Sequence, residues 1–67
     1  MFFDLPNGSR MWTGTYQTGD GCWTGQWGFM ASHALTVLGN DYHNRFAALL
    51  ALYKFATDKM GGKMVRR

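Results

Sequence analysis

The sequence predicts an α+β fold, in which an aromatic-faced antiparallel β-hairpin packs on an antiparallel helical pair. Three observations predict it. Aromatic residues recur at even spacing on both sides of Gly19-Asp20-Gly21, an apolar segment follows at 30–38, and apolar residues recur every three or four positions between 41 and 60. Even spacing is typical of a strand with one buried face, and spacing of three or four is typical of a helix. A chain of 67 residues is expected to form a single domain, 1–67.

The predicted hairpin spans residues 11–29. Two-residue loops such as Gly-Asp and Asp-Gly suit hairpins because these turns match the twist of the strands. We favour Asp20-Gly21, which sets aromatic rings opposite strand glycines, and we reject a three-residue loop because it would divide the aromatic residues between two faces. The residues expected to share one face are Trp12, Tyr16, Trp23, Trp27 and Phe29. This face is expected either to be core beneath the helices or to bind a partner.

The spacing Trp12-x-Gly14-x-Tyr16 and the partial repeat Trp23-x-Gly25-x-Trp27 resemble the aromatic-x-Gly-x-aromatic core of the membrane occupation and recognition nexus (MORN) repeat. The resemblance covers about one and a half short units, and proteins of this type stack several repeats to bury a core. The spacing after Gly19 departs from the family pattern. The resemblance therefore implies a hairpin here, and no function is carried over from it.

The rest of the chain divides at its turn residues. Residues 1–10 are expected to be a turn segment with a Pro-Asn-Gly turn, and Phe2, Phe3 and Leu5 are expected either to pack against the helices or to form a short edge strand. Residues 30–60 are expected to form a helical hairpin: a short helix at about 30–38 that ends before Gly39, and a long helix at about 41–60 capped by Asn40 or Asp41. Residues 61–67 are expected to be a flexible basic tail.

The predicted long helix carries apolar residues on two faces. Its main stripe, which we expect to be buried, consists of Tyr42, Phe46, Leu49, Leu50, Tyr53, Ala56 and Met60. Its second face consists of Ala48, Leu52 and Phe55. A helix that is apolar on most sides is normally buried on most sides, and so short a chain cannot cover both faces. We therefore expect the second face to meet another chain.

Few residues suggest chemistry. Cys22, His33, His43 and Asp41 do not match the spacing of a known zinc site, and no carboxylate is placed to orient a Cys-His pair. We expect no catalytic residue, no metal and no cofactor, and hence no enzyme. A single cysteine forbids an internal disulfide and fits a reducing, cytoplasmic location. No stretch is long enough to span a membrane, and no secretory signal is apparent.

The sequence therefore predicts a non-enzymatic protein–protein interaction module. It is expected to be either a small accessory subunit of a larger assembly or a phage-type (viral) inhibitor or modulator of a host protein, and to form an oligomer or bind a protein partner. The residues expected at the interface are Trp12, Trp23, Trp27, Leu52 and Phe55. The alternative is nucleic-acid binding through the basic C-terminal end, since the net charge is +3. Its candidate contacts are Arg45, Lys54, Lys59, Lys63, Arg66 and Arg67.

Overall fold

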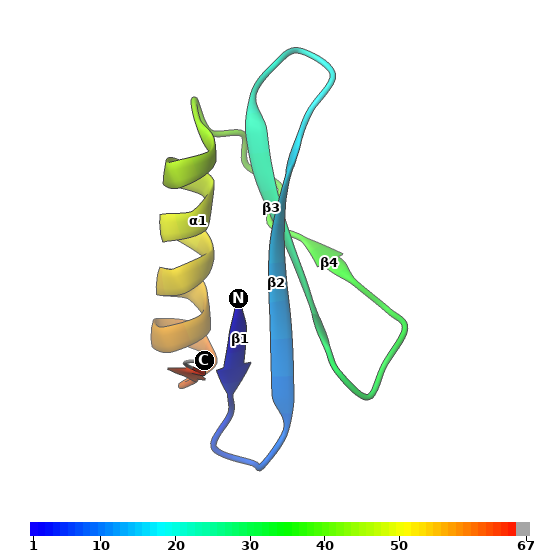
Figure 1. The fold of residues 1–67 in the computed structure, drawn as a ribbon, viewed down its shortest axis with the longest axis vertical. Helices are drawn as coiled ribbons and strands as arrows, with labels where there is room; N and C mark the ends of the chain where they lie inside the picture. Colours follow the sequence, from blue (N-terminus) through cyan, green and yellow to red (C-terminus); the bar gives the residue numbers. More distant parts are fainter. Residues whose placement is uncertain (66–67) are drawn as a thin grey trace.

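A computed structural model describes residues 1–65 and shows one antiparallel sheet of five strands with a helix on one of its faces (Figure 1). The elements in chain order are β1 (Phe2–Asp4), β2 (Arg10–Gln17), β3 (Trp23–Phe29), β4 (Thr36–Val37), α1 (Arg45–Lys54), the π-helical turn η1 (Phe55–Lys59) and β5 (Lys63–Met64). The strand order is β4-β3-β2-β1-β5. The long β2–β3 hairpin forms the centre of the sheet, and the short strands add to its two edges.

The hairpin closes through the three-residue loop Gly19-Asp20-Gly21. The Thr18 N–H donates to the Cys22 carbonyl across a distance of 2.7 Å, and Gly21 has φ +88°. A three-residue loop needs a left-handed residue at its third position, and glycine occupies that conformation without steric cost. The prediction of a two-residue loop is therefore wrong, because Gly21 takes the left-handed conformation that a three-residue loop requires.

The three-residue loop decides which side chains share a face. Thr15 lies opposite Gly25 and Thr13 opposite Trp27, so odd-numbered residues of both strands share one face. Trp27 and Phe29 are on that face with Trp23, whereas Trp12 and Tyr16 are on the other. The prediction that all five aromatic residues share one face is wrong, since a loop longer by one residue moves one strand's side chains to the opposite side.

The predicted helix at 30–38 is absent, and the segment instead forms a loop followed by β4, which pairs with β3. Ser32 Oγ accepts from the Ala34 N–H at 3.1 Å, and such local bonds compete with helix formation. Thr36 and Val37 are β-branched and suit a strand. The helical pair predicted from the apolar spacing is therefore a single helix facing a sheet.

The predicted long helix at 41–60 begins later and is shorter. Trp23 and Tyr42 exchange two backbone hydrogen bonds of 2.8 and 2.6 Å, which keep Tyr42 extended beside β3. Asn44, not Asn40 or Asp41, is the N-cap, and its side chain accepts from the Ala47 N–H at 2.8 Å. No helix among residues 1–65 has the length and apolar content that a bilayer crossing requires.

The helix is held on the sheet by small residues and one leucine. Ala48, Leu52 and Ala56, spaced four residues apart, are fully buried, and Leu52 lies directly on Gly25 of β3. Beside them Phe3, Leu5 and Met11 complete the core. The face that the sequence predicts as free is thus the buried one, because its small residues let α1 approach the sheet closely.

The two ends of the chain meet in the sheet. The Pro6–Ser9 turn connects β1 to β2 as predicted, with a 2.8 Å bond from the Leu5 N–H to the Ser9 carbonyl. The C-terminal segment was predicted to be a flexible tail, but β5 pairs with β1 and the Val65 N–H bonds the Phe2 carbonyl at 2.8 Å. Arg66 and Arg67 lie outside the described residues.

The contact between Leu52 and Gly25 predicts unequal effects of two alanine substitutions. A Cβ atom at Gly25 would lie 2.7–2.9 Å from three carbon atoms of Leu52, so Gly25→Ala should destabilise the fold by about 1–3 kcal/mol. Gly14→Ala is the matched control, because its Cβ would meet only Trp12 Cζ3 at 3.9 Å. Urea unfolding monitored by tryptophan fluorescence measures both. Equal midpoints for the two variants would contradict this packing.

Candidate functional site

One stripe of α1 points away from the sheet and is apolar. Phe46, Leu50 and Tyr53, which we call the outer stripe, are spaced at i, i+4 and i+7, so they lie along one side of the helix. Their exposed fractions are 72%, 44% and 38%. A soluble chain normally covers a continuous apolar stripe of this kind with another surface.

A groove of about 450 Å³ runs along the other side of α1, between the helix and the segment that leads from β4 to α1. We call it the aromatic groove. Its lining residues are Trp27, Thr36, Val37, Leu38, Asn40, Tyr42, Ala51 and Phe55. Ala51 lines the groove from the helix side, and its small side chain leaves room between the helix and this segment.

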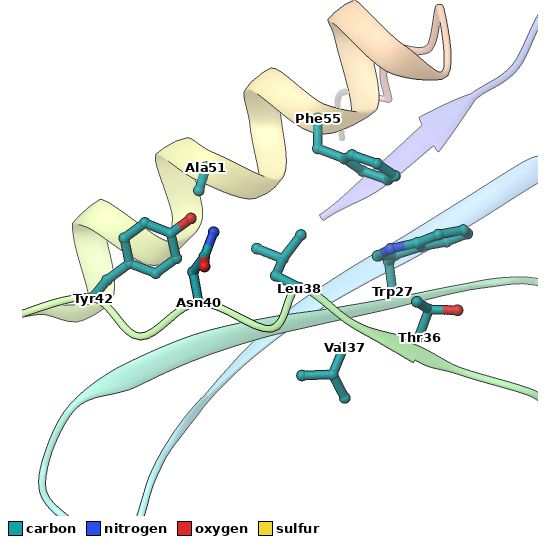
Figure 2. A pocket seen from close by; sticks show the side chains of 8 residues that line it. All are labelled: Trp27, Thr36, Val37, Leu38, Asn40, Tyr42, Ala51 and Phe55. Atoms are coloured by element: carbon teal, nitrogen blue, oxygen red, sulfur yellow. The ribbon is translucent and has the colours of Figure 1, made fainter.

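The two ends of the aromatic groove differ in chemistry. Figure 2 shows Trp27 and Phe55 at one end, Tyr42 and the Asn40 side chain at the other, and Leu38 between them. The ring centroids of Trp27 and Phe55 are 5.2 Å apart. Binding pockets typically combine an apolar lining with a few polar groups that orient the ligand. This groove can therefore accept an apolar side chain or ring and hydrogen-bond a polar group beside it.

The five predicted interface residues separate in the structure. Trp27 and Phe55 meet in the aromatic groove. Trp12 is half-buried on the opposite face of the sheet, where a Cβ atom at Gly28 would lie 3.0 Å from its Nε1. Trp23 is half-buried and pairs through its backbone with Tyr42. Leu52 is fully buried in the core, so its side chain is not available to a docking partner.

The sequence reasoning missed the exposure of the outer stripe. Phe46, Leu50 and Tyr53 were placed in the buried stripe because of their spacing of three or four residues. The signal that distinguishes the two faces is side-chain size: Ala48 and Ala56 let the helix lie close to strand glycines and threonines, and bulky aromatic residues do not. Leu38 and Tyr42 were missed because the segment before the helix was predicted to be helical.

The basic residues of the alternative site do not form one surface. Arg45 lies at the start of α1, where its Nε is 3.4 Å from Thr15 Oγ1, and Lys54 lies at the other end of α1, about 14 Å away along the axis. Lys59 and Lys63 are exposed near Lys54 in the sequence. The predicted contacts Arg66 and Arg67 lie outside the described residues.

The side chains that often carry chemistry are dispersed. Residues 1–65 contain no group of three His, Cys, Asp or Glu side chains that could hold a metal ion. His33 and His43 are exposed, the first in the loop before β4 and the second just before α1 rather than on helices as predicted. Partial burial raises the pKa of the Cys22 thiol, and the Asp20 and Asp41 carboxylates raise it further. A raised pKa keeps this thiol protonated and weakly nucleophilic at neutral pH.

Asp20 stabilises the hairpin loop. Its Oδ1 accepts hydrogen bonds from the Thr18 hydroxyl at 2.5 Å and from the Cys22 N–H at 3.3 Å. These bonds favour the charged carboxylate and lower the pKa of Asp20 below its ordinary value of 3.8. A group whose pKa falls on folding stabilises the folded state above its unfolded pKa, and this contribution is lost as the pH falls through its folded pKa.

We expect Asp20→Asn to lower the melting temperature slightly at pH 7, because the amide keeps the hydrogen-bonding oxygen but removes the charge. The difference from the wild type should persist down to about pH 4 and then shrink as the pH falls below the ordinary value of 3.8. Circular dichroism melts at several pH values measure it. A difference that is the same at pH 7 and pH 2 would show that the charge has no role.

Comparisons of this chain with protein-family models, with curated proteins and with solved structures find no match. The likeness of the hairpin to the MORN core is therefore not accompanied by a family match. Function has to be inferred from the side chains that this fold exposes and brings together.

Proposed function

We propose that this chain is a non-enzymatic protein–protein interaction module that docks through apolar surfaces on the two sides of α1. The observation that carries the proposal is the outer stripe, in which Phe46 is 72% exposed. Covering apolar surface is favourable by roughly 25 cal/mol per Å². A protein partner that covers Phe46, Leu50 and Tyr53 would gain this free energy, and charged side chains do not interrupt the stripe.

The aromatic groove supports the same function. Aromatic residues at the centre of an interface carry a large share of its binding energy, and Trp27 and Phe55 lie together at one end of the groove. A partner that inserts an apolar side chain there can also hydrogen-bond Asn40 or the Tyr42 hydroxyl. These features suit a small accessory subunit or a phage-type inhibitor, and the single unpaired cysteine suits a cytoplasmic location.

Nucleic-acid binding is the second candidate, and the observation that favours it is the exposure of Lys54, Lys59 and Lys63 near one end of the helix. Phosphate contacts weaken steeply with salt, whereas apolar docking responds little. Binding of a labelled 20-nucleotide single strand should therefore be weak and should disappear between 50 and 200 mM salt. Tight binding of this strand that falls steeply with salt and is unchanged by Phe46→Glu would favour nucleic acid over a protein partner.

Site-specific photocrosslinking tests the proposed function. A benzophenone amino acid at position 46 should give one dominant crosslinked protein product in the cells that make the chain, because this position lies in the docking surface. The same amino acid at position 54 is the matched control, since Lys54 is exposed on α1 outside the outer stripe. A homodimer or a complex with another protein would each support docking. Equal, diffuse labelling from both positions would contradict it.

A further inference from the structure

The two loops at opposite ends of β2 have the same construction (Figure 1). They are Pro6-Asn7-Gly8, between β1 and β2, and Gly19-Asp20-Gly21, between β2 and β3. A backbone hydrogen bond of 2.8 Å closes the first loop and one of 2.7 Å closes the second. The third residue of each is a left-handed glycine, with φ +87° at Gly8 and +88° at Gly21. The loops therefore differ mainly in their middle residue.

The middle residue of each loop folds its side chain back onto the backbone. Asn7 Oδ1 accepts from the Ser9 N–H at 2.9 Å, and Asp20 Oδ1 accepts from the Cys22 N–H at 3.3 Å. Such a bond spans the peptide that follows the middle residue. It therefore holds the side-chain carbonyl carbon of Asn7, Cγ, beside the backbone nitrogen of Gly8. The bonded N–H also draws electrons from this carbon, which makes it a better target for a nucleophile.

We propose that Asn7 is a site of spontaneous deamidation, in which water converts its side-chain amide to a carboxylate. The Gly8 nitrogen gives its proton to hydroxide and attacks Asn7 Cγ. The bond from Cγ to the side-chain nitrogen breaks, and that nitrogen takes a proton from water and leaves as ammonia. Water then opens the resulting succinimide ring at either carbonyl carbon, which leaves aspartate or isoaspartate at position 7. One water is consumed, one ammonia is released, and nothing is oxidised.

Gly8 favours the attack. Any other residue would place a Cβ atom beside the attacking nitrogen. The surroundings are open, since a Cβ atom at Gly8 would meet nothing within 4 Å, so hydroxide can reach the N–H. This N–H donates to the Leu5 carbonyl at 3.0 Å, and the bond has to open before the proton can leave. Asn7 and Gly8 are exposed, and bonds in exposed loops open at little cost in free energy.

The other two asparagines lack these features. Asn40 is followed by Asp41, whose side chain hinders the attack and whose carboxylate opposes loss of the backbone proton. Asn44 is followed by an arginine, and its Oδ1 accepts from the Ala47 N–H at 2.8 Å. This bond directs the Asn44 side chain toward the first turn of α1. Asn7 should therefore react first.

The two products have different effects on the fold. Aspartate at position 7 keeps the oxygen that accepts from the Ser9 N–H, as Asp20 does in the second loop, and lowers the formal net charge of +3 by one. Isoaspartate adds one carbon to the main chain between β1 and β2. Because Phe3 of β1 is fully buried, isoaspartate should destabilise the chain more than aspartate does. This inference goes beyond the proposed function, since the loop contains no residue of the outer stripe or the aromatic groove.

Peptide mass analysis tests the site. Trypsin cleaves after Arg10 and Arg45, so the peptide of residues 1–10 contains Asn7 and the peptide of residues 11–45 contains the other two asparagines. When the folded chain is incubated at mildly alkaline pH, the first peptide should gain about 1 Da. It should do so roughly tenfold faster than the second peptide. The rate should rise with pH, because hydroxide removes the proton. Equal rates in the two peptides would overturn Asn7 as the site.

Asp20→Asn is the matched variant, because it places an Asn-Gly pair in the second loop. The peptide of residues 11–45 should now gain mass almost as fast as the peptide of residues 1–10, whose own rate should not change. Circular dichroism before and after incubation shows whether the chain stays folded. If the variant leaves the rate of the 11–45 peptide at its wild-type value, the shared loop construction does not promote the reaction and the proposal is overturned.

Discussion

The contact of Leu52 with Gly25 is the interaction on which the rest of the structure depends. Leu52 is fully buried, and its side chain occupies the space that any Cβ atom at position 25 would fill. This contact fixes the helix over the hairpin at the level of Thr15. The core of so short a chain contains few large side chains, so a single well-packed leucine supplies a large share of the burial that holds the helix in place.

The exposed surfaces follow from the way in which this contact orients the helix on the sheet. Because Ala48, Leu52 and Ala56 face the sheet, the bulky residues of α1 have to face elsewhere. Phe46, Leu50 and Tyr53 are left on one flank, and Phe55 and Ala51 on the other, where the segment before the helix forms the second wall of the groove. The length of the loop Gly19-Asp20-Gly21 also determines which side chains are exposed. It places Thr13 and Thr15 beneath the helix and Trp12 and Tyr16 on the opposite face of the sheet.

Part of this arrangement could be read from the sequence. The hairpin at 11–29 and the turn at Pro6–Ser9 could be predicted because glycine, proline and asparagine determine local backbone conformation. The pairing register could not, because Gly19-Asp20-Gly21 is compatible with loops of two or three residues and the choice reverses one face. The segment 30–38 was assigned to a helix on spacing alone, whereas its β-branched residues pair with β3.

The candidate site was predictable to a similar extent. Trp27 and Phe55 were expected at an interface and lie together in the groove. Leu52 was predicted to be at an interface and Phe46 to be buried, and the structure shows Leu52 buried and Phe46 exposed. Apolar spacing identifies two faces of a helix without saying which of them meets the sheet. Residue size decides this, since the face with Ala48 and Ala56 can approach a strand most closely. The assignment of residues 63–65 to a flexible tail was also wrong, because the pairing of β5 with β1 joins segments that are far apart in the sequence.

The most direct measurement is a nuclear Overhauser experiment on the chain in solution. If the three-residue loop and the seating of α1 are as described, the Hα atoms of Thr15 and Gly25 should give a strong cross-peak, and the Leu52 methyl groups should give cross-peaks to Gly25 Hα. Cross-peaks that instead pair Tyr16 with Gly25 or with Trp23 would indicate a two-residue loop. That result, or the absence of any contact between Leu52 and Gly25, would contradict the structure's assignment of buried and exposed helix faces.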